Sequence, residues 1–503
     1  MRNHSPFKLI FRKITNPSDA EIIFESLYSQ SANTFWLDSS RVMKGYSRFS
    51  FMGECGVGEN DFLLNYSTLK EEIVKEFNGR TERINTLLFP YLNQIINESE
   101  VEELDLPFKF RGGLVGYLGY ELKKETVKAT VYQSPFPDAI FFFITRFLAF
   151  DHLTGELYVI ALVGENDGDA GELWIENTGK KIAELSFHSP IRDALTEASN
   201  HPIQFCLERD YHQYLRDIAI CKQKILDGES YEVCLTNQIK AKLEIEDWHL
   251  YKTLRKVNPA PYSAFLRFRE FSILSSSPEQ FLDIQSDRWV STKPIKGTVK
   301  RRETEAEDLR ARQSLGQNEK DQSENLMIVD LLRNDLGKVC EIGSVSVPKL
   351  MDVETYATVH QLVSTVKGRL KPEVSAVDCV EAVFPGGSIT GAPKIRTMEI
   401  IDQLEWEARG IYTGSIGYFS YNQTAEFNIA IRTIIHQKDQ ISFGAGGAII
   451  DLSDPEAEFR EILVKAYPMI QAVVGAVDAT DFLLDEMTGE EMIMYLDPSL
   501  RSG

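Results

Sequence analysis

The sequence contains few cysteines, and their spacing predicts neither a disulfide framework nor a cysteine-based metal site. The six cysteines lie at positions 55, 206, 221, 234, 340 and 379, and no two of them form a Cys-x-x-Cys pair. Disulfide-rich secreted proteins and structural zinc sites both rely on closely spaced cysteines. We therefore expect a chain of the reducing cytoplasm, without structural disulfides.

Long apolar runs and an excess of basic residues are also absent. Residues 1–8 lack the apolar core of a signal peptide, and Arg146 and Asp151 soon follow the apolar run 139–144. That run therefore predicts a strand and not a membrane span. A net charge of −21 disfavours nucleic acid and anionic membranes as partners. The chain also lacks a Walker loop and a Rossmann fingerprint.

What the chain does contain is enough apolar sequence for a large core. It has 503 residues, of which 43% are hydrophobic, so it can form one large domain or two to three ordinary ones. Residues 1–190 look like an α/β region, residues 205–475 alternate strands and helices, and residues 478–503 form an acidic tail. Periodicity and end signals predict helices over 211–226, 248–257, 305–315, 320–337, 376–383, 394–404 and 455–471.

The predicted helix over 320–337 combines an apolar middle with acidic residues. Its apolar density indicates burial, and Gly337 is a natural place for it to stop. Asp321 and Glu324 are three residues apart and share one face of the first turn. One interpretation is a capping pair, with Asp321 as N-cap and Glu324 at the third position. The other is half of a cation site, because buried carboxylates are costly unless they are paired or bind a metal.

A second acidic pair lies on the helix predicted after Ser453-Asp454-Pro455. There Glu458 and Glu461 are three residues apart, and Lys465 follows four residues after Glu461, so all three share one face. Alone, such a face is most often solvated surface. Two acidic pairs on two helices suit a hard, oxygen-seeking ion such as Mg²⁺, which needs few carboxylates.

Five motifs in order resemble the chorismate-utilising enzymes. They cover residues 294–298, 324–335, 385–394, 409–418 and 453–458. This family includes the component I chains of anthranilate and aminodeoxychorismate synthases, and the isochorismate and salicylate synthases. The resemblance covers residues 205–475 strongly, and residues 37–40 and 112–121 extend it into the N-terminal half. It implies an α/β fold in which two stacked antiparallel β-sheets form a large sandwich surrounded by helices.

The resemblance also implies a magnesium ion that holds the ring carboxylate of chorismate. Glu324 and Glu461 would bind Mg²⁺ directly, and Asp321 and Glu458 would bind it through water. Asp321 stands where some relatives have Glu, which fits this outer role.

Further positions match substrate-binding residues of the family. Arg432 would hold the enolpyruvyl carboxylate, because a planar guanidinium suits a carboxylate fork. Tyr412 and the backbone amides of Gly446, Gly447 and the following residue would help to hold that group. The remaining substrate contacts implied are Lys465 near the metal-bound carboxylate, and Ser388 or Thr390 near the departing C4 hydroxyl.

Three residues match catalytic positions. Glu279 would protonate the departing hydroxyl and so must keep its proton near neutrality. His360 matches an active-site histidine, although a lone histidine is more often structural. Lys296 matches the lysine of aminodeoxychorismate synthases, where anthranilate synthases carry Ala, and would attack C2 of chorismate. Such a lysine must be neutral, so we expect its pKa to be lowered. Glu232 replaces the base lysine of the water-adding relatives, which disfavours those activities.

The implied activity is amino transfer to chorismate, giving 4-amino-4-deoxychorismate for 4-aminobenzoate, folate or a related aromatic amine. Two alternatives stay open, namely anthranilate synthase component I and a catalytically silent homologue. The chain shows no glutaminase nucleophile loop. We therefore expect ammonia to come from a separate glutamine amidotransferase subunit.

Overall fold

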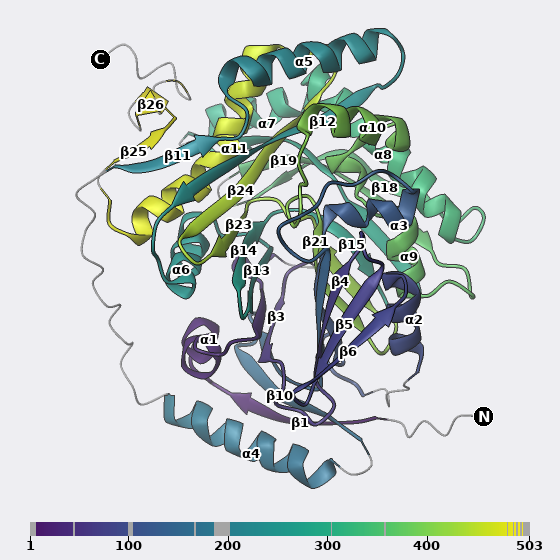
Figure 1. Cartoon of the computed structure of the whole chain (residues 1–503), viewed down its shortest axis with the longest axis vertical. Helices are drawn as coiled ribbons and strands as arrows, with labels where there is room; N and C mark the ends of the chain where they lie inside the picture. The colour runs from purple at the N-terminus through teal and green to yellow at the C-terminus, as the bar shows by residue number, and fades with distance from the viewer. Residues whose placement is uncertain are drawn as a thin grey trace.

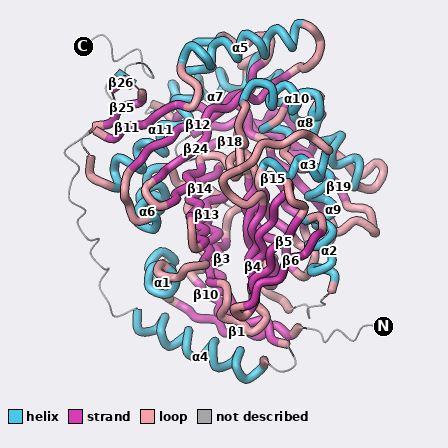
Figure 2. The backbone as a smooth tube through the Cα atoms, viewed as in Figure 1, coloured by secondary structure: helices cyan, strands magenta, loops and turns pink. Residues whose placement is uncertain are grey.

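The computed structural model describes residues 7–43, 46–98, 104–164, 167–185, 202–302, 304–356, 359–479, 481–485, 487–488, 491–492 and 495. Two large sheets form the centre of the molecule, and helices surround them (Figures 1 and 2). Within the described residues every strand pairing is antiparallel except that of the short strand β25 with β11. The predicted mixed α/β fold with two antiparallel sheets is confirmed.

The larger sheet has 14 strands among the described residues. Their order is β1 (Lys8–Thr15), β10 (Glu156–Val163), β9 (Arg146–Asp151), β3 (Phe49–Glu54), β2 (Thr34–Asp38), β13 (Tyr262–Phe268), β14 (Phe271–Ser277), β23 (Thr433–Gln437), β24 (Gln440–Ile449), β12 (Glu232–Lys242), β11 (Ile203–Leu207), β25 (Phe482–Leu484) and β26 (Met487–Thr488), and β20 (Gly391–Ala392) pairs with β12.

The smaller sheet has 12 strands in the same described ranges. Their order is β17 (Ile295–Lys300), β19 (Val359–Arg369), β16 (Trp289–Lys293), β15 (Gln280–Ile284), β22 (Ala425–Asn428), β21 (Ser415–Ser420), β7 (Gly113–Leu118), β8 (Ala139–Ile144), β4 (Phe62–Ser67), β5 (Glu72–Phe77) and β6 (Arg80–Asn85), and β18 (Ser346–Thr355) pairs with β19.

Each sheet contains strands from both halves of the chain. In the larger sheet β2 pairs with β13, and in the smaller sheet β7 pairs with β21. Strands from residues 1–190 and from residues 205–475 therefore pair with each other in both sheets. Of the predicted acidic tail, the structure describes β25, β26 and a few neighbouring residues, and the rest lies outside the described residues.

The helices are α1 (Ala20–Tyr28), α2 (Leu88–Asn97), α3 (Lys123–Val127), α4 (Gly168–Leu185), α5 (Tyr211–Leu226), α6 (Asp247–Val257), α7 (Glu305–Gly316), α8 (Glu319–Val339), α9 (Ala376–Val383), α10 (Lys394–Glu405) and α11 (Pro455–Ala476), with short 3-10 turns η1 (Tyr120–Leu122) and η2 (Gly387–Ile389). No helix in the described ranges is long and apolar enough to cross a membrane.

Aromatic side chains fill the space between the sheets and beneath the helices. Phe51 of β3 meets Tyr418 of β21 edge-to-face across the two sheets. On the outer face of the larger sheet, Trp36 of β2 stacks on Phe24 of α1 and contacts Trp248 of α6. These large buried surfaces supply much of the hydrophobic stabilisation. They hold the two sheets and their helices in fixed positions around the candidate site.

Candidate active site

The predicted site residues come from elements that are far apart in sequence. Lys296 lies on β17, Glu324 on α8, and Glu458, Glu461 and Lys465 on α11. Figure 1 shows α8, α11, β12 and β24 in the upper half of the molecule. Side chains of α8 and α11 are in contact, as described below.

Both ends of α8 differ from the sequence prediction. Its N-cap is Asn318, whose side chain accepts a hydrogen bond from the Asp321 backbone at 3.0 Å. Asp321 is therefore not the N-cap, and the predicted Asp321–Glu324 capping pair is wrong. The helix also continues past Gly337 to Val339, because Leu336 and Val339 still face the core. With the cap supplied by Asn318, both acidic side chains are available to the site.

Lys296 is buried and held by two carboxylates. Its Nζ donates to Oε1 of Glu232 at 2.9 Å and lies 3.6 Å from Oε2 of Glu324. Burial lowers the pKa of Lys296, but Glu232 and Glu324 raise it further, so the pKa lies above its ordinary value. The predicted lowering is wrong for this arrangement, because the sequence did not reveal that Glu232 lies opposite the amine.

The acidic residues of α8 and α11 surround a lysine that the sequence did not single out. Nζ of Lys320 lies 2.6 Å from Glu458, 3.6 Å from Glu324 and 3.6 Å from Glu461. Burial and the neighbouring Glu324 raise the pKa of Asp321 to about 6. These contacts place the two predicted acidic pairs at one location between the helices.

This carboxylate group has the chemistry of a divalent cation site. Glu458 is almost fully buried, and its Oε2 has no hydrogen-bond partner within the described part of the chain. Gly447 of β24 faces it, since a Cβ there would lie 3.3 Å from Glu458 Oε2 and 3.8 Å from Glu461 Oε1. Oxygen ligands with an orphaned carboxylate oxygen suit Mg²⁺. No group of three metal-ligating side chains is found among the described residues, and three of the four carboxylates lie within 3.6 Å of the Lys320 ammonium.

A glycine also allows α8 to approach the strand that carries Lys296. Gly297 has φ +77, and a Cβ there would lie 2.7 Å from Asp321 Oδ2. A larger residue would be strained in that conformation and would push Asp321 away. Gly297 therefore keeps Lys296 next to the carboxylate group.

Glu279 has the properties expected of an acid near neutrality. It lies between β14 and β15, it is buried, and burial raises its pKa to about 7. A hydrogen bond with Ser388 of η2 and the charges of Lys296 and Lys465 limit the increase. Thr390, also predicted near the departing hydroxyl, instead donates its hydroxyl to the carbonyls of Gly386 and Gly387.

Arg432 lies in a backbone conformation that is uncommon for a non-glycine residue, with φ +52. Burial lowers the pKa of its guanidinium to about 10, partly offset by Tyr412. No ion pair of this guanidinium is found in the described ranges. Strained backbone and a partly buried cation without a carboxylate partner are both typical of a ligand-binding position.

The glycines of β24 lie within its ladder with β12. Gly446 and Gly447 are opposite Thr236 and Leu235, and the carbonyl of Gly446 accepts a hydrogen bond from Lys465 Nζ at 2.8 Å. The same ammonium lies 2.7 Å from Glu461. Lys465 therefore links β24 to the acidic face of α11.

A family model described as chorismate binding enzyme matches residues 60–471, which include all of these site residues. The chain belongs to this family. A probable aminodeoxychorismate synthase from Oryza sativa subsp. japonica, named as chloroplastic, is 44% identical, and the alignment covers 91% of this chain and 56% of that protein. The aminodeoxychorismate synthase of Streptomyces pristinaespiralis is 42% identical over 93% of this chain and 65% of its own. The chain thus spans between about half and two thirds of the length of these relatives.

Two further comparisons involve proteins of more similar length. The aminodeoxychorismate synthase component 1 of Bacillus subtilis is 37% identical over 72% of this chain and 77% of that protein. The crystal structure of anthranilate synthase component I from Streptococcus pneumoniae matches with a TM-score of 0.72 at 28% identity, covering 91% of this chain and 98% of that one. The predicted family and fold class are therefore confirmed.

In this family member, the contacts of His360 do not include the other predicted catalytic residues. Its Nδ1 is 2.9 Å from the Thr355 hydroxyl, and its Nε2 is 3.0 Å from Asp308 of α7. Both ring nitrogens are thus occupied in joining α7 to strands of the smaller sheet. This arrangement favours a structural role for His360.

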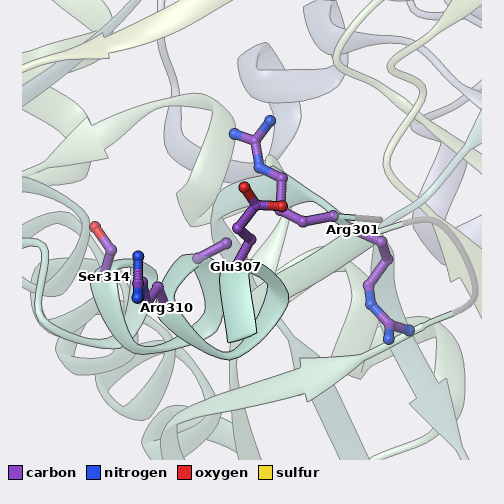
Figure 3. Close-up of a pocket in the computed structure, with 6 residues that line it drawn as sticks. Arg301, Glu307, Arg310 and Ser314 are labelled. Atoms are coloured by element: carbon purple, nitrogen blue, oxygen red, sulfur yellow. The ribbon is translucent and has the colours of Figure 1, made fainter. Parts of the chain in front are cut away.

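A surface pocket of about 660 Å³ beside α7 is also distinct from the carboxylate group. Arg301, Arg302, Glu307, Arg310, Ala311 and Ser314 line it, and Figure 3 shows the labelled side chains around it. None of the predicted catalytic, substrate-binding or metal-binding residues is among these six. We therefore assign the candidate site from the buried polar residues and not from this pocket.

Sequence reasoning missed the contacts of three residues that organise the site of this family member, although it named Glu232 as the replacement of a base lysine. Lys320 and Glu232 contact the predicted residues directly, as described above. Arg409 is fully buried and donates to Glu405 of α10, to the Ile389 carbonyl of η2 and to the Cys234 carbonyl of β12. It is the first residue of the 409–418 motif, but only the fold shows that it connects three elements.

Proposed function

We propose that this chain is the chorismate-converting part of an aminodeoxychorismate synthase, which makes 4-amino-4-deoxychorismate from chorismate and ammonia. The observation that carries the proposal is the buried Lys296, whose amine contacts Glu232 and Glu324 beside the carboxylate group. Alanine at this position would leave no nucleophile there. The names of the relatives from rice, Streptomyces and Bacillus support the same activity. The product would serve synthesis of 4-aminobenzoate, folate or a related aromatic amine.

In the proposed reaction Lys296 and Glu279 act on opposite ends of one displacement. The neutral Lys296 amine forms a bond to C2 of chorismate, the ring double bonds shift, and the C4–O bond breaks as Glu279 protonates the hydroxyl. Ammonia then bonds to C4, the double bonds shift back, and the C2–N bond to Lys296 breaks. The nitrogen newly bonded to C4 loses one proton, which restores Glu279, so the net products are 4-amino-4-deoxychorismate and water.

Glu232 is the acceptor placed to take the proton that Lys296 must lose first. It is fully buried, it contacts Lys296 at 2.9 Å, and its second oxygen has no hydrogen-bond partner among the described residues. Burial raises the pKa of Glu232, partly offset by Lys296, and a raised carboxyl pKa favours proton uptake.

The carboxylates of α8 and α11 would hold Mg²⁺ in the proposed enzyme, Glu324 and Glu461 directly and Asp321 and Glu458 through water. The ion would neutralise the ring carboxylate of chorismate and fix its position. Arg432 and Tyr412 would hold the second carboxylate of the substrate, and Lys465 would add positive charge near the first.

Six free cysteines fit a reducing compartment such as the cytoplasm.

Product identification tests this function. We expect the purified chain with chorismate, Mg²⁺ and ammonium to form 4-amino-4-deoxychorismate, detected by mass spectrometry, and to form none when glutamine replaces ammonium. The reason is that we propose a separate glutamine amidotransferase subunit as the source of ammonia. Anthranilate as the main product would assign the chain to the other synthase. Glutamine-dependent product from the chain alone would contradict the proposed partner.

At a fixed concentration of free ammonia, the rate should fall as pH rises above about 7, because Glu279 donates a proton and burial raises its pKa to about 7. Below that pH the acid is protonated and active, and well above it each pH unit removes about nine tenths of the acid form. Glu279→Gln should lower kcat roughly 10²-fold and abolish this decline. The exposed Glu270→Gln serves as the control. A decline that persists in Glu279→Gln would assign the acid to another group.

A further inference from the structure

The ammonium of Lys320 contacts carboxylates on both α8 and α11. It contacts Glu324 within its own helix and reaches across to α11, where it contacts Glu458 at 2.6 Å and Glu461 at 3.6 Å. Its side chain is 28% exposed, whereas that of Glu458 is 1% exposed. One cation therefore compensates carboxylates on both helices.

The other two lysines near these carboxylates have different attachments. Lys296 donates to Glu232, and Lys465 donates to the Gly446 carbonyl. Each also approaches one acidic residue of the group, Glu324 or Glu461. Lys320 thus contacts three of the four carboxylates, and Lys296 and Lys465 contact one each.

An ammonium and a magnesium ion compete for the same space. Mg²⁺ binds carboxylate oxygens at about 2.0–2.1 Å in a near-octahedral arrangement. A lysine nitrogen 2.6 Å from Glu458 and 3.6 Å from both Glu324 and Glu461 occupies the region between them. Two positive charges at one position would also repel each other strongly in a partly buried setting.

We propose that Lys320 is an internal counter-ion of the metal site, which holds α8 against α11 until a divalent cation displaces its ammonium. The inference rests on the metal site of the proposed function. In this proposal Lys320 lowers the affinity of the site for the metal ion and stabilises the metal-free protein. Without Lys320, the buried Glu324 of α8 and the buried Glu458 of α11 would lack this shared cation, and unpaired buried charge is costly.

Calorimetric titration of the metal-free protein with Mg²⁺ tests the inference without any reaction. We expect Lys320→Met to bind Mg²⁺ about tenfold or more tightly than the parent chain, because no ion pair has to break. Its melting temperature in EDTA should be lower, and the increase on adding Mg²⁺ should be larger. Lys320→Arg keeps the charge and should stay closer to the parent in both measurements.

Lys338→Met is a matched control. Lys338 lies on the same helix and pairs with Asp335 at 2.8 Å, so the variant makes the same change in charge outside the acidic group. Its Mg²⁺ affinity should equal that of the parent. Unchanged or weaker Mg²⁺ binding by folded Lys320→Met would overturn the inference, and so would the absence of binding in both proteins.

A measurement on the parent chain tests the inference even if Lys320→Met does not fold. Acetylation followed by mass spectrometry should label Lys320 faster when Mg²⁺ is present, with Lys338 as the internal reference. Equal labelling with and without Mg²⁺ would overturn displacement. None of these measurements uses chorismate. If the chain made anthranilate instead, the proposed function would fail while the role of Lys320 could still be confirmed.

Discussion

Lys296→Ala is expected to lose almost all formation of 4-amino-4-deoxychorismate while the protein still binds chorismate. The variant removes the amine that would bond to C2, so ammonia would have to displace the hydroxyl in one difficult step. We expect a decrease in kcat of roughly 10³-fold or more, since removing an enzyme nucleophile commonly has effects of this size or larger. The proposed substrate carboxylate ligands are untouched, so the dissociation constant of chorismate should change much less.

Two control variants separate the loss of a nucleophile from the loss of a charge. Lys296→Arg keeps a cation beside Glu232 but has no neutral amine, so it should be nearly as inactive as Lys296→Ala. Lys300→Ala changes an exposed lysine on the same strand and should keep the parent rate. Single-turnover analysis by mass spectrometry would follow the product and any anthranilate formed instead. Parent-rate product from Lys296→Ala would contradict both the covalent role and the choice between the two synthases.

Local signals in the sequence were enough to predict several helices closely. The predicted bounds of α5 and α9 agree with the structure, because Asp210 and Ser375 supply N-caps whose side chains accept backbone hydrogen bonds. The end of α8 was predicted two residues early. Gly337 does not stop it, because burial of Val339 in the core favours two more helical residues than the local signal does. Tertiary packing thus overrides a weak local preference.

The acidic residues of the site were predictable, but their central cation was not. Spacing places Asp321 and Glu324 on one face of α8, and Glu458 and Glu461 on one face of α11. Lys320 looks like an ordinary helix-surface lysine in the sequence, and its contact with Glu458 spans 138 residues. The pKa of Lys296 failed as a prediction for the same reason. Its sign depends on Glu232, a residue from a distant strand that only the fold brings close.

Glu324→Gln is expected to abolish activity while the protein remains folded. Glu324 is buried on α8 and contacts both Lys296 and Lys320, and it is one of two proposed direct Mg²⁺ ligands. Glutamine keeps the size and one oxygen but removes the negative charge that the ion requires. The change also relieves repulsion among the carboxylates, so the melting temperature in EDTA should fall little. Activity should decrease roughly 10²-fold or more, since metal ions supply several kcal/mol of charge stabilisation.

Metal removal and a matched variant complete this test. Activity of the parent chain should disappear in EDTA and return with excess Mg²⁺, whereas Glu324→Gln should regain little. Glu319 lies five residues earlier on α8, at an exposed position, and Glu319→Gln should behave like the parent. Calorimetry should show weakened Mg²⁺ binding only in Glu324→Gln. Full activity of the parent chain in EDTA would contradict the assignment of a metal site. If Glu324→Gln instead bound Mg²⁺ as tightly as the parent, Glu324 would not be a direct ligand. The direct ligands would then be among the remaining carboxylates, and loss of a ligand could not explain the inactivity.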